Sequence, residues 1–123
     1  MNFGPQATVP ERFRNRKFHV HNPTVTLMRT TPEECRKLGE EIGSKAAAST
    51  GPVAILFPSK GISAIDADGQ PFEDIAAREA LRDGLLSSCG PVAVDVRPEH
   101  INDPSFAEAA ARKLLELISL HRR

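Results

Sequence analysis

The chain has 123 residues, of which 40% are hydrophobic and 26% are charged, with 16 basic side chains balancing 16 acidic ones. This length and composition predict one folded domain with a single core, and they exclude an intrinsically disordered chain. The balanced charge argues against nucleic acid as a partner. No apolar run approaches the roughly 20 residues of a membrane helix. The first residues lack the features of a secretory signal, so we expect a cytoplasmic protein that does not associate with membranes.

The beginning of the chain is predicted to be an arm followed by a short strand. Residues 1–16 show no sustained period and contain two prolines and several arginines. We interpret them as an extended arm, and we interpret residues 17–123 as a single α/β domain. Apolar and polar residues alternate over residues 18–21, which predicts a strand that Pro23 ends.

The rest of the chain is predicted to alternate helices with buried strands. Residues 31–34 read Thr-Pro-Glu-Glu, which is typical of a capping box with proline at the first helical position. The apolar runs at 53–57 and 92–96 favour strands buried on both faces, as in a parallel sheet. Asp74 and residues 102–104 carry the start signals of a second and a third helix.

This order of elements predicts a three-layer, Rossmann-like α/β sandwich with a short parallel sheet and the order β-α-β-α-β-α. Three strands are few for such a sheet, so at least one edge should be open to pairing with another chain. The chain also has no Trp or Tyr, which removes the side chains that bury the most area. We therefore expect a homodimer or higher oligomer, with the arm reaching across the interface.

Ligands of open parallel sheets bind beyond the carboxyl ends of the strands. Three polar segments follow those ends here, at 21–26, 59–66 and 97–103. If the topology is right they meet at one edge, where lysine, serine and backbone N–H groups can hold a small phosphorylated or carboxylated ligand. The candidate ligand-binding residues are His21, Asn22, Thr24, Lys60, Gly61, Ser63, Asp66, His100 and Asn102.

Several of these candidates also have a purely structural interpretation. Ser63 can cap a turn, Asp66 can brace its loop, and Gly61 can supply backbone freedom. His100 can be a general acid or base, or it can hold the turn before the last helix, which Asp103 caps. The candidate catalytic residues are Ser63, Asp66, His100 and Asp103, and a hydrolase using Ser63 and His100 is one alternative.

Metal and disulfide chemistry are not expected. His19 and His21 share one face of a strand, but no third ligand stands at a recognisable spacing, so we reject a metal site. We expect Cys35 and Cys89 to be small core or helix-face residues without a disulfide.

Motifs for nucleotide binding are also missing, because the chain has no Walker A sequence and no Gly-x-Gly-x-x-Gly after a strand. It also has no Gly-x-Ser-x-Gly, the motif that presents a nucleophilic serine. Gly39 and Gly43 lie four residues apart in the first predicted helix. We interpret them as a small-residue face for close helix packing, either within the domain or across a dimer.

Four segments, at residues 1–13, 21–34, 51–72 and 100–110, together resemble the carboxyl-terminal part of a known family. It is the uncharacterised protein family with a Tm-one-like ATP-binding domain, whose plant member is the tomato mosaic virus resistance protein, an inhibitor of viral RNA replication. Its members are much longer and combine two Rossmann-like halves, with the ATP site attributed to the amino-terminal half.

This resemblance implies an α/β domain that is incomplete relative to the full family domain, with no cofactor expected in this chain. It implies that the partner is a second copy or the missing amino-terminal half. A non-catalytic oligomerisation or protein-interaction module is therefore an alternative to ligand binding. The matching segments include residues 21–24, 60–66 and 100–104, which are the same three loops.

Overall fold

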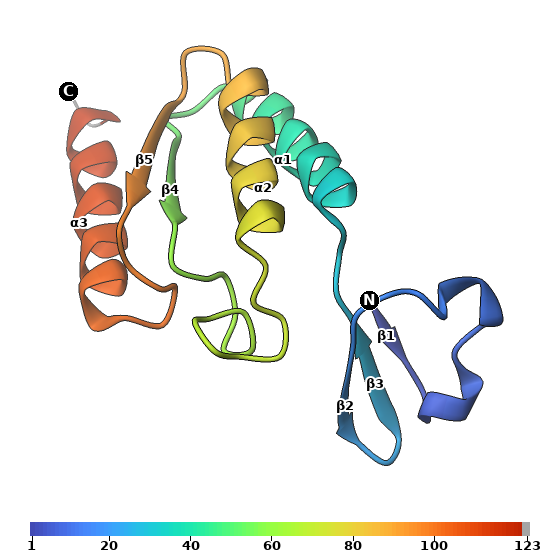
Figure 1. Cartoon of the computed structure of the whole chain (residues 1–123). Coiled ribbons are helices and arrows are strands. Elements are labelled where there is room, and N and C mark those ends of the chain that lie inside the picture. Colours follow the sequence, from blue (N-terminus) through green and yellow to red (C-terminus); the bar gives the residue numbers. More distant parts are fainter. Residues whose placement is uncertain (122–123) are drawn as a thin grey trace.

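The structure, a computed structural model, describes residues 1–121 (Figure 1). Over this range the chain forms a three-stranded antiparallel sheet, a two-stranded parallel sheet and three α-helices. The antiparallel strands are β1 (Asn2–Phe3), β2 (Phe18–Asn22) and β3 (Val25–Met28), and the parallel strands are β4 (Ala54–Pro58) and β5 (Ala93–Arg97). The helices are α1 (Pro32–Ala47), α2 (Ile75–Ser88) and α3 (Pro104–His121).

Residues 1–16 are folded and do not form the extended arm that we expected. Strand β1 pairs antiparallel with β3, and two short 3-10 turns follow it. The Phe3 and Phe13 rings pack with centroids 5.7 Å apart. Arg16 donates to Glu34 at 2.6 Å, which ties the segment to α1. The extended conformation is therefore corrected, and contact of this segment with another chain stays a prediction.

The expected three-stranded parallel sheet is also corrected, because the strand predicted at 18–21 belongs to a hairpin. Strand β2 pairs antiparallel with β3, a strand that the sequence reasoning missed. The turn between them is held by Asn22 Oδ1, which accepts from the Thr24 N–H at 2.9 Å and from its hydroxyl at 3.0 Å. So tight a turn allows only antiparallel neighbours, since a parallel crossover needs a dozen or more residues.

The helix start signals are confirmed. The Glu34 N–H donates to Thr31 Oγ1 at 3.2 Å, and the Thr31 N–H donates to the Glu34 carboxylate at 2.9 Å, which completes the capping box. Asp74 caps α2 by accepting from the Ala77 N–H at 2.9 Å. These contacts satisfy N–H groups that the first helical turn leaves unpaired.

Helices α1 and α2 pack closely through glycines. Gly39 and Gly43 of α1 and Gly84 of α2 are buried, and a Cβ atom on Gly39 would collide with the Leu81 carbonyl oxygen. The small-residue face therefore acts within the domain. Cys35 and Cys89 are buried and free, as expected.

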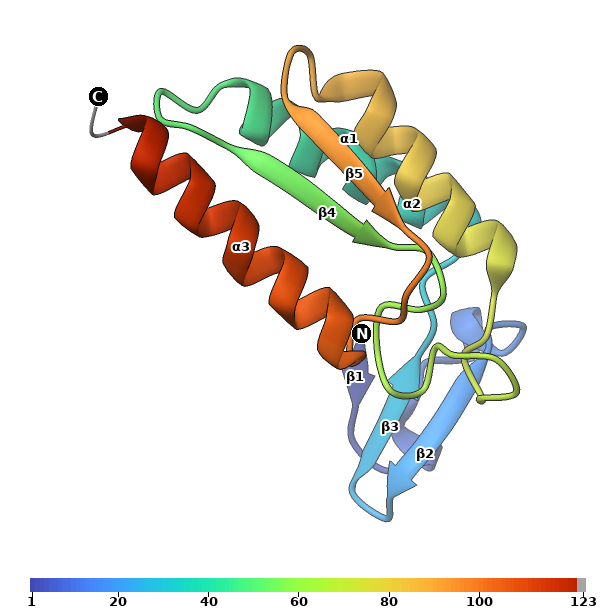
Figure 2. The same ribbon diagram turned by 90° about the vertical axis from the view of Figure 1, so that its left-hand side faces the viewer.

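The three layers predicted from the sequence are present, but the parallel sheet in the middle has two strands instead of three. Helices α1 and α2 lie on one side of the β4–β5 pair and α3 lies on the other (Figures 1 and 2). The class is therefore mixed α/β with parallel β-α-β units, as predicted, but only β4 and β5 are parallel in the part of the chain that is described. None of the helices in residues 1–121 is long and apolar enough to cross a membrane.

Candidate functional site

The loops that follow β4 and β5 meet at the carboxyl edge of the parallel sheet. The Ser59 N–H donates to the Arg97 carbonyl at 2.9 Å, and the Lys60 N–H donates to the Glu99 carbonyl at 3.1 Å. Lys60 itself is exposed. Two of the three segments predicted to share this edge are therefore brought together.

The third predicted segment does not join them. His21, Asn22 and Thr24 lie at the tip of the β2–β3 hairpin and are exposed. Figure 1 shows this tip at the end of the antiparallel sheet, away from the carboxyl edge of β4 and β5. The expected grouping of these three residues with the other candidates is corrected, because β2 is not a strand of the parallel sheet.

Gly61 allows the two loops to approach closely. Its φ angle is 144°, and a Cβ atom there would collide with the Asp66 carbonyl oxygen and lie 2.5 Å from the His100 ring. Only glycine tolerates both conditions. The Ile101 N–H also donates to the Gly61 carbonyl at 3.0 Å. Backbone freedom, rather than a phosphate cradle, is the role that this geometry gives to Gly61.

Both ring nitrogens of His100 form hydrogen bonds, one within its own loop and one to the loop after β4. Nδ1 accepts from the Asn102 N–H at 3.1 Å, so Nε2 carries the proton and donates to the Ser63 carbonyl oxygen at 2.8 Å. Asp103 accepts from the His100 N–H at 2.8 Å. His100 therefore contacts the main chain of Ser63 and not its hydroxyl, which is not the arrangement of a nucleophile and its base.

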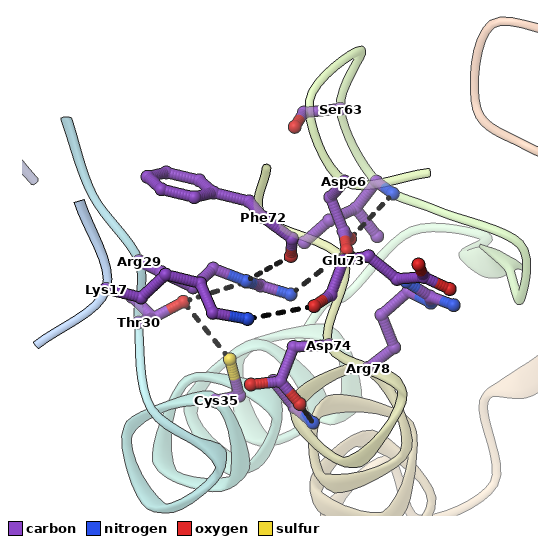
Figure 3. A network of polar contacts seen from close by, with 12 residues as sticks. Lys17, Arg29, Thr30, Cys35, Ser63, Asp66, Phe72, Glu73, Asp74 and Arg78 are labelled. Carbon is purple, nitrogen blue, oxygen red and sulfur yellow. Dashed lines mark hydrogen bonds and ion pairs between the residues drawn. The ribbon is translucent and has the colours of Figure 1, made fainter. Parts of the chain in front are cut away.

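Asp66 lies at the centre of a buried group of charges, which we call the Asp66 cluster: Arg29, Asp66 and Arg78 (Figure 3). Asp66 is 1% exposed, and each arginine is 7% exposed. Its Oδ1 accepts from Arg78 at 2.8 Å and lies 3.3 Å from Arg29 Nη2, while Oδ2 accepts from the Ile62 N–H at 3.2 Å. The expectation that Asp66 braces its loop is confirmed by these contacts.

The Asp66 cluster links three parts of the fold. Arg29 follows β3, Asp66 is in the loop after β4, and Arg78 is in the first turns of α2. Arg29 Nε also donates to the Phe72 carbonyl at 3.1 Å, and the His19 ring packs edge-on against the Phe72 ring. The antiparallel sheet is thereby fixed to the loop at the carboxyl edge.

A small cavity of about 80 Å³, which we call the α2 cavity, lies between the end of β4 and α2. The residues that line it are Phe57, Ser59, Ile75, Arg78, Glu79 and Arg82. Sequence reasoning did not select Arg78 or Arg82, because arginines on a helix are usually solvated. Their spacing of four residues, which places both on one helix face, was the available signal.

Arg97, at the end of β5, is engaged in ion pairs. It donates to Glu99 at 2.9 Å and to Asp95 at 3.1 Å. The hydrogen bonds that Arg97 donates to Glu99 and Asp95 raise the pKa of Arg97 above its ordinary value. Its guanidinium is therefore a permanent cation whose two terminal nitrogens already donate to carboxylates.

The described residues also give no metal site. The His19 and His21 rings lie 6.4 Å apart on β2. Within residues 1–121, no group of three or more histidine, cysteine, aspartate and glutamate side chains is placed to share a metal ion.

Comparison with known proteins shows that almost the whole chain is similar in sequence to members of one family. Residues 1–118 match the C-terminal domain of the uncharacterised protein family UPF0261. The chain is 48% identical over 114 residues to a UPF0261 protein of Mesorhizobium japonicum, which covers 90% of this chain and 29% of that protein. It is 41% identical over 120 residues to the ToMV resistance protein Tm-1 of Solanum lycopersicum, covering 95% of this chain and 16% of that protein.

A UPF0261 protein of Clostridium tetani is 42% identical over 120 residues, covering 96% of this chain and 30% of that protein. The chain thus spans less than a third of the length of these curated relatives. The match extends beyond the four segments that carried the resemblance and includes both loops of the carboxyl edge. The chain therefore belongs to the UPF0261 family and corresponds to its C-terminal domain.

Proposed function

We propose that this chain binds a small phosphorylated or carboxylated ligand at the carboxyl edge of β4 and β5, within a larger or oligomeric assembly. The observation that carries the proposal is the Asp66 cluster, in which two buried guanidinium groups share one carboxylate at this edge. Buried charge is stable only when it is paired, so an excess of one positive charge favours an anion nearby. The carboxyl edge is also where open α/β sheets bind ligands.

The two loops are suited to hold such a ligand because their geometry is fixed. His100 ties the two loops together and Asp66 braces the loop after β4, so both act as positioning residues. Lys60 is an exposed cation on this fixed frame, with Ser63 as a neutral donor in the same loop and Asn102 as a neutral donor in the loop after β5. A rigid frame lowers the entropy cost of binding.

Calorimetric titration with a panel of small phosphorylated and carboxylated compounds tests this proposal. Lys60→Ala should weaken binding of any ligand found by about tenfold, because a lysine contact to an anion is a charge-assisted hydrogen bond. Lys45→Ala is the matched control, since Lys45 is exposed on α1, away from the carboxyl edge. Unchanged affinity in Lys60→Ala, or no binding of any compound in the panel, would count against the proposal.

A second candidate is a non-catalytic assembly module, and the exposure of large apolar side chains favours it. Leu38 and Ile42 of α1 are 45% and 48% exposed, and Leu114 and Leu115 of α3 are 58% and 64% exposed. Parallel sheets are normally larger and covered on both faces. We propose that a second copy, or the amino-terminal part found in the longer relatives, covers these residues and extends the sheet.

Native mass spectrometry over a range of concentrations tests the assembly candidate. We expect a homodimer or higher oligomer that Leu115→Lys dissociates, because it places a charge on the exposed face of α3. Thr50→Lys, in the exposed segment after α1, is the control and should leave the subunit number unchanged. A monomer at every concentration would argue against self-assembly and leave the amino-terminal part as the partner to test.

A further inference from the structure

We infer that the α2 cavity receives the anionic group of the ligand, a single carboxylate or phosphate. This inference deepens the proposed function and rests on it for the rest of the ligand. The cavity lies next to the exposed Lys60, because Ser59 is part of its wall. None of the residues selected from the sequence as ligand-binding lines it, so it adds a subsite to the candidate edge.

The size of the cavity fits one such group. Its volume is about 80 Å³, and a water molecule occupies roughly 30 Å³ in the liquid. The space therefore has room for at least two or three water molecules, and so for one carboxylate or one phosphate. The remainder of a ligand would extend from the opening toward the loop that carries Lys60.

The wall includes a buried cation with an unused donor. Arg78 is 7% exposed and donates through Nη1 to Asp66 at 2.8 Å, but its Nε has no hydrogen-bond partner among residues 1–121. Nearly all buried polar groups in native proteins have a partner. An oxyanion in the cavity next to Arg78 would supply that partner, and a guanidinium is well shaped to bind two of its oxygens.

A second cation lies one helical turn further along α2. Arg82 lines the cavity with its side chain one third exposed, held in place by Asp83, to which it donates at 2.9 Å and 3.1 Å. The one acidic residue in the wall is Glu79, which is exposed. Both arginines already have a carboxylate partner, Asp66 for Arg78 and Asp83 for Arg82, so hydrogen bonds from their remaining donors, rather than an unpaired charge, would hold an anion in the cavity.

We would test the inference by NMR on the complete ¹⁵N-labelled chain, titrated with inorganic phosphate and, separately, with acetate. The expected result is a saturable shift of an arginine Nε–Hε signal and of the backbone amides at the start of α2. Arg82→Glu should weaken this binding by about tenfold or more, because it replaces an attraction with a repulsion at the cavity wall. Arg82→Lys keeps the charge and should retain binding.

Arg36→Ala is the matched control. Arg36 is a half-exposed arginine of α1 that also approaches Asp83, at 4.0 Å, but it does not line the cavity. Its removal should leave the affinity for phosphate and acetate unchanged. Arg82 and Arg36 form their ion pairs with Asp83 and Glu40, outside the Asp66 cluster, so the variants should remain folded. The backbone spectrum checks this directly.

The outcomes separate this inference from the proposed function. Binding of phosphate or acetate that Arg82→Glu removes and Lys60→Ala preserves supports the subsite, even if no organic ligand is found. Binding that depends on Lys60 but not on Arg82 overturns the subsite and leaves the proposed function intact. The absence of any saturable shift with either anion also overturns the subsite. A preference for phosphate or for acetate identifies the class of ligand.

Discussion

Asp66→Asn should destabilise the whole fold, because Asp66 is the only carboxylate of the buried Asp66 cluster. The carboxylate receives three groups: Arg78 at 2.8 Å, Arg29 at 3.3 Å and the Ile62 N–H at 3.2 Å. Asparagine has nearly the same size, but its amide NH₂ donates where the carboxylate accepts. The variant therefore keeps the packing and leaves two buried guanidinium groups without a counter-charge.

The expected cost follows from the burial of all three side chains, which are 1% to 7% exposed. Removing one partner of a buried ion pair typically costs about 3–5 kcal/mol. Small domains have a total unfolding free energy of about 5–15 kcal/mol. The loss would therefore be a large part of the stability of this chain, and with a urea slope of about 2 kcal/mol/M it lowers the unfolding midpoint by about 2 M.

Urea unfolding followed by circular dichroism measures this difference. Asp68→Asn is the control, because Asp68 is exposed in the same loop, and its midpoint should match that of the unmodified chain. A difference of less than about 1 kcal/mol between Asp66→Asn and the unmodified chain would refute the reasoning, because it would mean that the buried charges are solvated or otherwise balanced.

Three further predictions concern the packing of α1 against α2, the cap of α1 and the loops of the carboxyl edge. Gly39→Ala should lower the free energy of unfolding by about 1–3 kcal/mol, because the new Cβ forces α1 and α2 apart; Gly51→Ala meets open space and should change little in the same urea assay. Glu34→Gln should make the free energy of unfolding less sensitive to acid. The hydrogen bond from the Thr31 N–H lowers the pKa of Glu34, so the ionised carboxylate stabilises the fold above its ordinary pKa of 4.5, and this stabilisation is lost as pH falls through the lowered pKa. Urea midpoints between neutral pH and pH 3 check this, and equal acid sensitivity in both proteins would contradict it. Gly61→Ala should separate the two loops of the carboxyl edge, because its φ is 144°, and amide hydrogen exchange in those loops should rise while exchange in α1 does not.

The sequence determined the elements whose signals are local. The capping box at Thr31 and Glu34, the cap at Asp74 and the apolar runs that became β4 and β5 all lie within a few residues of the structure they specify. Such signals act through hydrogen bonds and burial that form within one turn or one strand. They were enough to predict the α/β class, the parallel arrangement of two of the three expected strands, and two of the three loops expected at the carboxyl edge.

Strand partners were not determined in this way. The alternation at 18–21 predicted a strand correctly, but it contains no information about which strand lies beside it. The tight turn after β2, held by Asn22, made the pairing antiparallel and moved His21 away from the carboxyl edge. A strand pairs wherever its backbone finds a partner, so its neighbour depends on the path of the chain.

At the candidate site, too, the sequence determined some features and the tertiary structure determined others. From the sequence alone, Asp66, Ser63 and His100 could be ligand-binding or structural. Arg78 and Arg82 were not selected, although their spacing of four residues places both on one helix face. Only the folded chain brings Arg29, from the end of β3, and Arg78, from α2, onto the two sides of Asp66. The sequence therefore supplied the charged groups, and the tertiary structure decided their environment, because burial and pairing depend on segments that are far apart along the chain.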